Sequence, residues 1–307
     1  MRYRQVAGQP VSVIGFGGAK LSLHAHRPSE EEAIRTIHAA LDAGITLLDT
    51  ADIYALDFPD MGHNERLFAK AIRTWPGDRD DLLVATKGGQ YWDDGKAVFD
   101  GSAAKIRAAC TASLTALGVE RIGLYLLHRL PGDYAPRGSV WGDTFAETIE
   151  TLRELQKEGL VAHVGLSNVD VSMAESALQT LELAAIENPI GVLAPIEADQ
   201  LALCEREDIA LLGWGPLKGT VPSNPTPDDG PVRDRVGVLR EIGSAHGVSL
   251  QQVTLAWELA TSVQVIPLVG ARRPESVIDS AAAVELALTD EELRAIEDAG
   301  SPTDTDE

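Results

Sequence analysis

Cysteine, basic residues and long apolar runs are scarce in this sequence. Its 307 residues include two cysteines, Cys110 and Cys204, and each lies in a helix-like run, so we expect buried thiols rather than a disulfide. Acidic residues outnumber basic ones by 47 to 26, which gives a net charge of −21. Nucleic acids and anionic membranes attract positive surfaces, so we expect neither as a partner.

Apolar runs are also too short to cross a bilayer, which takes about 20 consecutive apolar residues. Residues 1–5 lack the apolar segment of a secretory signal, so we expect a cytoplasmic protein. Hydrophobic residues nevertheless make up 44% of the chain, which is enough for a sizeable core.

Short apolar runs typical of buried strands alternate with amphipathic segments typical of helices. The strands are predicted at residues 11–17, 46–51, 82–86, 122–127, 161–166, 183–186, 209–213 and 263–267. A first helix is expected between the Ser29–Glu32 capping box and Gly44. Further helices are predicted at residues 63–75, 102–117, 143–158, 171–180, 197–205, 232–246, 249–260 and 274–283.

This alternation indicates an α/β protein with a parallel sheet and right-handed crossovers. Eight strands are the number that closes a (β/α)8 TIM barrel. A doubly wound open sheet is the alternative, but it would need a phosphate fingerprint at its first turn. We therefore predict one barrel domain over residues 1–300. An N-terminal β-hairpin at residues 2–14 would close its bottom, and an acidic, disordered tail would follow at 301–307.

The glycine-rich segment Gly15-Phe16-Gly17-Gly18 invites comparison with a dinucleotide fingerprint. That motif needs a helix directly after it, whereas Pro28 and other non-helical residues intervene here. A strand end where the backbone passes close to a ligand explains the glycines better.

Polar residues follow the predicted strands at the end where barrel enzymes place their chemistry. Asp49 and Tyr54 follow one strand, Lys87 the next and His128 the one after. A lysine beside a tyrosine lowers the pKa of the phenol, an aspartate keeps that lysine charged, and a histidine can orient a substrate oxygen. Such a set can protonate an oxyanion that forms when a carbonyl accepts hydride, which requires a redox cofactor.

Each of these residues also has a structural interpretation. Taken alone, Asp49 could be a buried structural carboxylate, Tyr54 a packing aromatic and His128 a strand-end histidine. Their occurrence together at neighbouring strand ends favours the catalytic interpretation. No histidine pair has the spacing of a zinc-binding helix, so we expect no metal site.

Several segments together resemble the aldo-keto reductase superfamily across nearly the whole chain. The matching segments are residues 44–54, 62–65, 86–87, 127–129, 165–168, 214–217 and 270–275. The resemblance implies a (β/α)8 barrel with an N-terminal hairpin, and NAD(P)H-dependent reduction of a small-molecule carbonyl substrate. It also implies that Tyr54 is the general acid, that Lys87 and Asp49 tune it, and that His128 orients the substrate.

The resemblance also assigns residues to a nicotinamide cofactor. They are Ser167, Asn168 and Glu187 at the carboxamide, Trp214 against the ring, Gly215, Leu217 and Gly219 along the pyrophosphate, and Gly270, Arg272, Arg273, Ser276 and Asp279 at the adenosine phosphate. The two arginines favour NADPH over NADH, because a 2′-phosphate pairs with arginine. Glu187 departs from the usual glutamine, Ser276 from an arginine and Asp279-Ser280 from Glu-Asn.

Substrate contacts are expected from loops at the barrel mouth. The candidates are Tyr91, Trp92, Arg129, Tyr134 and Trp141. The loop at residues 55–61 is longer than is common in the family and should shape the pocket. Two alternatives to a general reductase stay open: a tailoring enzyme for natural products, including a non-reductive one, and a nucleotide-binding regulatory subunit.

Overall fold

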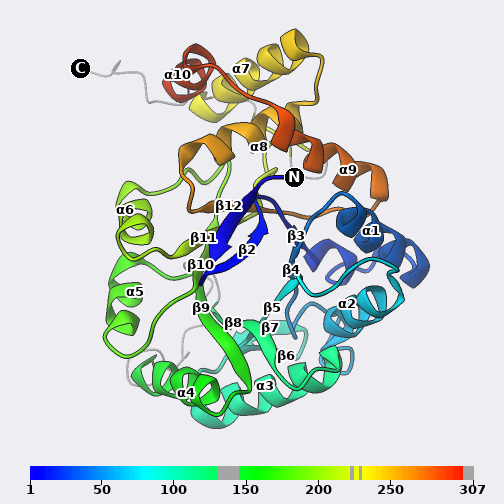
Figure 1. Ribbon diagram of the computed structural model, residues 1–307, viewed down its shortest axis with the longest axis vertical. Helices are drawn as coiled ribbons and strands as arrows, with labels where there is room; N and C mark the ends of the chain where they lie inside the picture. Colours follow the sequence, from blue (N-terminus) through cyan, green and yellow to red (C-terminus); the bar gives the residue numbers. More distant parts are fainter. Residues whose placement is uncertain (130–144, 222–224, 228–229, 300–307) are drawn as a thin grey trace.

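Eight parallel strands close into a barrel at the centre of the computed structural model, which describes residues 1–129, 145–221, 225–227 and 230–299 (Figure 1). Around the barrel the order is β10-β11-β12-β3-β4-β5-β8-β9. The strands are β3 (Gly15–Gly17), β4 (Leu47–Asp49), β5 (Leu83–Gly88), β8 (Ile122–His128), β9 (Val161–Ser167), β10 (Ala185–Pro189), β11 (Ala210–Trp214) and β12 (Val265–Val269). The predicted (β/α)8 barrel is therefore confirmed, and the open-sheet alternative is excluded.

Helices surround the barrel (Figure 1). They are α1 (Glu30–Asp42), α2 (His63–Thr74), α3 (Ala103–Leu117), α4 (Phe145–Lys157), α5 (Val171–Leu178), α6 (Ala198–Arg206), α7 (Gly230–His246), α8 (Leu250–Thr261), α9 (Pro274–Ala282) and α10 (Asp290–Ala299). The capping box expected at the start of α1 is present, because Ser29 Oγ accepts from the Glu32 backbone and the Glu32 carboxylate accepts from Ser29 N.

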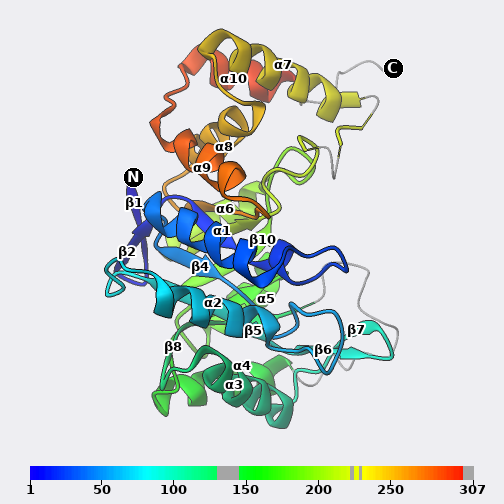
Figure 2. The same ribbon diagram turned by 90° about the vertical axis from the view of Figure 1, so that its right-hand side faces the viewer.

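The N-terminal hairpin consists of β1 (Tyr3–Val6) and β2 (Gln9–Ser12), which pair antiparallel. Figure 2 shows it at one end of the barrel, with β6 (Gln90–Asp93) and β7 (Lys96–Phe99) at the other. Val6 and Val11 of the hairpin are fully buried and join the core inside the barrel. The expected closure of the bottom is thus present, and the opposite end is left for the site.

Three features of the chain differ from the predicted elements. The predicted strand 11–17 is two strands, because β2 belongs to the hairpin and β3 begins the barrel. The hairpin of β6 and β7 was not predicted. Nor was α10, which begins at a capping box of Thr289 and Glu292 and lies beside α7, where Arg235 Nε donates to Ile296 O at 3.1 Å (Figure 2). This helix is short and acidic, and Ile296 is its buried residue.

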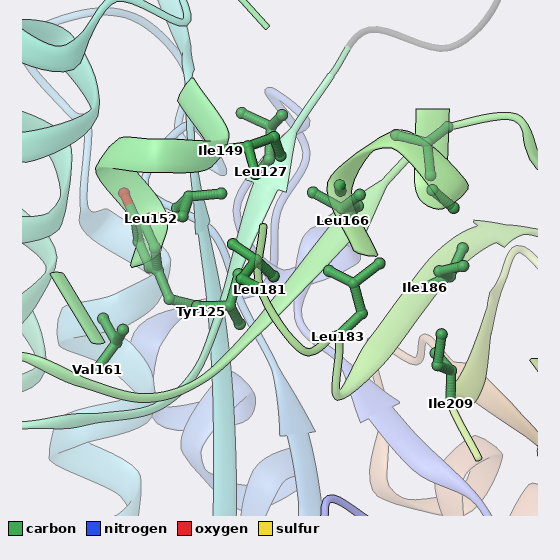
Figure 3. Packing of buried hydrophobic residues seen from close by; sticks show 14 of the residues in the cluster. Tyr125, Leu127, Ile149, Leu152, Val161, Leu166, Leu181, Leu183, Ile186 and Ile209 are labelled. Atoms are coloured by element: carbon green, nitrogen blue, oxygen red, sulfur yellow. The ribbon is translucent and has the colours of Figure 1, made fainter. Parts of the chain in front are cut away.

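A large apolar cluster fills the space between the barrel and helices α3 to α6. Figure 3 shows Leu127 of β8 next to Ile149 and Leu152 of α4, Leu166 of β9 beyond them, and Ile186 of β10 near Leu183 and Ile209. Cys110 and Cys204 are buried in the same cluster as free thiols, as expected.

Among the described residues, no helix is long and apolar enough to cross a membrane. The same part of the chain contains no group of three or more histidine, cysteine, aspartate and glutamate side chains that could hold a metal ion. Tyr134, Trp141 and the expected tail at 301–307 lie outside the described residues.

Glu258 is an unusual core residue of α8. It is 2% exposed, and neither carboxyl oxygen has a hydrogen-bond partner among the described residues. Burial raises the pKa of this carboxyl well above its ordinary value. Such a carboxyl destabilises the folded state least below its ordinary pKa, where it is protonated in both the folded and the unfolded protein. The destabilisation grows as the pH rises, because only the unfolded carboxyl then ionises readily.

We expect Glu258→Met to raise the free energy of unfolding at neutral pH by about 1–3 kcal/mol, since it removes unsatisfied polar atoms from the core. Glu258→Gln should remove the pH dependence of this cost but keep the unpaired polar atoms. Thermal unfolding from acid to alkaline pH measures both effects, with the exposed Glu241→Gln in α7 as control. An unchanged melting temperature in both Glu258 variants would show that this carboxyl carries no cost.

Candidate active site

Three adjacent barrel strands bring the four predicted catalytic residues together. Asp49 ends β4, Lys87 lies in β5 and His128 ends β8, while Tyr54 follows β4 by five residues. Parallel strands deliver their carboxyl ends to one side of the barrel. The expected convergence of Asp49, Tyr54, Lys87 and His128 at one mouth is therefore what the structure contains.

Lys87 is the centre of this group and is fully buried. Its Nζ donates to Asp49 Oδ1, to Thr50 O at 3.0 Å and to the Tyr54 hydroxyl at 3.3 Å. Burial lowers the pKa of Lys87, but Asp49 and Glu187 raise it more, so the pKa lies above its ordinary value. The lysine is therefore an ammonium at any physiological pH.

Glu187 joins the same group from β10 on another side of the barrel. Its Oε2 lies 3.4 Å from Lys87 Nζ, and the residue is 1% exposed. Burial and the neighbouring Asp49 raise the pKa of Glu187 to about 8. Lys87 is thus held between two carboxyl groups, which the sequence did not predict.

Tyr54 and His128 face each other across the mouth. Their ring centroids are 5.9 Å apart and the rings meet edge to face at 84°. Burial raises the pKa of Tyr54 above its ordinary value although Lys87 acts to lower it, so the phenol keeps its proton. Burial and Lys87 hold the pKa of His128 well below its ordinary value, so the imidazole is neutral.

The predicted lowering of the Tyr54 pKa by Lys87 is therefore present as one influence, but burial outweighs it. A protonated phenol beside an ammonium can give up a proton when negative charge develops on a nearby oxygen. The neutral His128 can donate one hydrogen bond, and its Nδ1 has no partner among the residues described. The arrangement suits an acid that acts on an oxyanion.

One glycine of the segment before the first helix, Gly18, is required by packing within the chain. A Cβ on Gly18 would lie 2.3 Å from Asn64 Oδ1 and 2.5 Å from Phe68 Cε2, both in α2. Asn64 in turn donates to Gly18 O at 2.9 Å and accepts from Thr50 Oγ1 at 2.6 Å. Gly18 is thus required by the close approach of α2. Asn64 of the same helix also holds the segment after Asp49 in place through its hydrogen bond with Thr50.

Ser167, Asn168 and Trp214 lie together at the ends of β9 and β11. Trp214 Nε1 donates to Asn168 Oδ1 at 3.0 Å, and Asn168 Nδ2 donates to Arg129 O at 2.7 Å. Ser167 Oγ is buried and has no hydrogen-bond partner in the described part of the chain. A buried hydroxyl without a partner beside a half-buried tryptophan fits a ligand that brings polar groups.

A basic cluster lies next to these residues in a strongly acidic protein. Burial, Arg272 and Lys218 lower the pKa of Lys20, which places the three cations near one another. The Nζ of Lys218 lies 4.2 Å from the centroid of the Trp214 ring. Sequence analysis found Arg272 but missed Lys20 and Lys218, because they are distant in the chain and neither belongs to a basic run.

Other residues assigned to the cofactor border this cluster or α9. A Cβ on Gly270 would lie 3.4 Å from Lys20 Cδ, while Gly215 and Gly219 have positive φ values of 75° and 87° in the loop that contains Leu217. Arg273 and Ser276 are exposed at the start of α9.

Asp279 has another set of contacts. Its two carboxylate oxygens accept from Ser249 Oγ at 2.8 Å and Gln252 Nε2 at 2.7 Å, both at the start of α8. The Asp279 side chain therefore links α9 to the start of α8.

Three of the five predicted substrate residues lie within the described part of the chain, in different surroundings. Trp92 Nε1 donates to Ile53 O at 3.1 Å, next to Tyr54. Tyr91, its neighbour in β6, points to the opposite face, where Lys105 Nζ lies 4.8 Å from its ring centroid. The guanidinium of Arg129 contacts Met173 in α5. Trp92 is thus the candidate with a direct contact to the segment that carries Tyr54.

The loop at 55–61 is tied to the segment before α1. Arg27 forms an ion pair with Asp60 at 2.5 Å, and the Asp60 carboxylate also accepts from Leu56 N at 3.2 Å. Phe58 is 63% exposed at its tip. Charged and backbone contacts therefore fix the base of the loop, and its tip offers an aromatic side chain to the surroundings.

The fold and the comparisons with known proteins define the class: this is an enzyme, an oxidoreductase built on a (β/α)8 barrel. The sequence profile of the aldo/keto reductase family matches residues 13–300. The chain belongs to this family, whose members use nicotinamide cofactors and act on small-molecule carbonyl substrates.

Relatives of known name cover nearly the whole chain. A 6-dehydroglucose reductase from Novosphingobium aromaticivorans is 30% identical over 297 residues, 92% of this chain and 90% of its own. The structure of a glycerol dehydrogenase from Gluconobacter oxydans has a TM-score of 0.82 at 27% identity and covers 99% of this chain and 98% of its own. The holo form of an aldo-keto reductase from Bacillus halodurans has a TM-score of 0.78 at 27% identity, with 99% of each chain covered.

Proposed function

We propose that this protein reduces the carbonyl group of an aldehyde or ketone to an alcohol with NADPH, and that Tyr54 donates the proton. The observation that carries the proposal is the contact of the Tyr54 hydroxyl with Lys87 Nζ at 3.3 Å, opposite the ring of His128. Lys87 is charged, so it stabilises the phenolate that remains after the proton has left.

His128 positions the substrate in this proposal. Its neutral imidazole donates a hydrogen bond to the carbonyl oxygen that Tyr54 protonates. Asp49 keeps Lys87 charged and directs it, because the ammonium is fully buried and needs a carboxylate partner. The nicotinamide, when bound, supplies the hydride, which no side chain can provide.

The residues around the mouth fit a phosphorylated nicotinamide cofactor. Ser167, Asn168 and Glu187 would hold the carboxamide, and Trp214 would lie against the ring. The unpartnered Ser167 Oγ supports this placement. Lys20, Lys218 and Arg272 would take the phosphates, since a protein with a net charge of −21 needs a local concentration of cations for that purpose.

We expect Arg272→Ala to raise KM for NADPH about 10–100-fold, because a hydrogen bond to a charged group contributes about 1.5–3 kcal/mol. KM for NADH should change much less, because NADH lacks the 2′-phosphate. Steady-state kinetics with both cofactors measure the ratio, with Arg153→Ala in α4 as control. An equal rise for both cofactors would place Arg272 away from the 2′-phosphate.

The function itself is tested by following NADPH absorbance with two kinds of carbonyl compound. Aromatic aldehydes are chosen because Trp92 offers an aromatic side chain near Tyr54. Aldehydes derived from sugars are chosen because the chain is similar to a 6-dehydroglucose reductase. Turnover of either kind supports the proposal and indicates the substrate class. Tight binding of NADPH without turnover of any carbonyl would instead favour the nucleotide-binding regulatory function.

A further inference from the structure

Because of Glu187, the buried carboxyl groups around Lys87 outnumber the single ammonium. One ammonium faces two carboxyl groups, from Asp49 of β4 and Glu187 of β10, and all three side chains are at most 4% exposed. Lys87 has three N–H donors but four oxygens around it, those of Asp49, Thr50, Tyr54 and Glu187. Tyr54 at 3.3 Å and Glu187 at 3.4 Å therefore compete for the same donor.

Among the residues that the structure describes, no other group of the mouth balances the second carboxyl. The titratable side chains that face Glu187 are Asp49, Lys87 and Tyr54, with the neutral His128 beyond Tyr54. The strands on either side of β10 bring no charge, because β9 ends in Ser167 and β11 in Trp214. Two adjacent carboxylates with one cation would leave a buried negative charge, so the pair retains one proton.

The proton resides on Glu187 rather than on Asp49. Asp49 is the direct partner of Lys87, and the ammonium opposes the rise in the pKa of Asp49 that burial causes. Glu187 is the more distant of the two, and burial and Asp49 raise its pKa to about 8. In this state the protonated Glu187 can donate a hydrogen bond to the neighbouring Asp49 carboxylate.

We propose that Glu187 is a positioning residue that acts on Tyr54 through Lys87. While Glu187 is protonated, Lys87 Nζ stays hydrogen-bonded to the Tyr54 hydroxyl. When Glu187 ionises, the second carboxylate attracts the ammonium away from Tyr54. This inference rests on the proposed function of Tyr54. A charged Glu187 also disfavours the phenolate directly, because like charges repel. The reaction therefore slows as Glu187 ionises.

The pH profile of kcat in the direction of carbonyl reduction tests this coupling. With NADPH and substrate saturating, we expect kcat of the wild-type protein to fall about tenfold per pH unit once the pH has passed about 8. In Glu187→Gln this descent should be absent over the same interval, because an amide does not ionise. Descents of the same midpoint and depth in both proteins would overturn the proposal.

An infrared measurement, which needs no turnover, tests the proposal even if a protein in the kinetic experiment is inactive. The infrared difference spectrum between the cofactor-free wild-type protein and Glu187→Gln, in which the protonated carboxyls of Glu258 and Asp52 cancel, should contain a protonated-carboxyl band that disappears around pH 8. If Glu187→Gln is inactive or unfolded, the change in the wild-type band decides: a protonated-carboxyl band of constant intensity from below to above pH 8 overturns the proposal. If no carbonyl is reduced by the wild-type protein, the proposed function fails, while the band still shows whether the carboxyl pair holds its proton.

Discussion

Replacing Tyr54 by phenylalanine is expected to lower kcat for carbonyl reduction about 10²–10⁴-fold, the usual contribution of a well-placed general acid. The substitution removes only the hydroxyl that lies 3.3 Å from Lys87 Nζ and leaves the ring edge-on to His128. The affinity for NADPH should stay nearly unchanged, because Tyr54 is not among the residues proposed for the cofactor, which lie at β9, β10 and β11, after β3 and at the start of α9. The measurement is steady-state turnover together with titration of tryptophan fluorescence by NADPH.

The pH dependence of the same variant adds a second observation. Residual turnover in Tyr54→Phe should not depend on the state of Glu187, because the phenol through which Glu187 acts is gone. The matched control is Tyr3→Phe in β1, a tyrosine that is 57% exposed at the opposite end of the barrel. Equal rates in Tyr54→Phe and wild type would exclude Tyr54 as the proton donor.

Sequence periodicity predicted most of the fold because the barrel strands are buried apolar runs bounded by polar residues. The strand predicted at 46–51, for example, is β4 with its final Asp49, and the run at 122–127 is β8 with its final His128. Parallel strands all end on the same side, so the order of polar residues along the chain predicted the group at the mouth.

Contacts between distant segments could not be predicted in the same way. Lys20 and Lys218 join Arg272 only because the barrel brings β3, β11 and β12 side by side. Glu187 was assigned to the cofactor by resemblance, and its approach to Lys87 depends on the geometry inside the barrel. The hairpin of β6 and β7 has strands of four residues, too short for clear alternation.

Replacing Lys87 by methionine is expected to have the largest effect on stability. Asp49 and Glu187 would remain buried without a cation, and breaking a buried ion pair from one side costs about 3–5 kcal/mol. Without Lys87 the pKa values of both carboxyl groups rise further in the folded state. The loss of stability should therefore be small below the ordinary carboxyl pKa and grow as the pH rises. Denaturant unfolding at several pH values measures it.

A combined variant separates the stabilising role of Lys87 from its role in catalysis. Asp49→Asn and Glu187→Gln, added to Lys87→Met, remove the unpaired charges and should restore most of the free energy of unfolding and abolish its extra pH dependence. Turnover should stay lost, since no ammonium stabilises the Tyr54 phenolate. Lys70→Met, which breaks an exposed ion pair with Glu30, should change stability little. Recovery of turnover in the combined variant would mean that Tyr54 acts without a cation, and it would remove both Lys87 and Glu187 from the proposed acid.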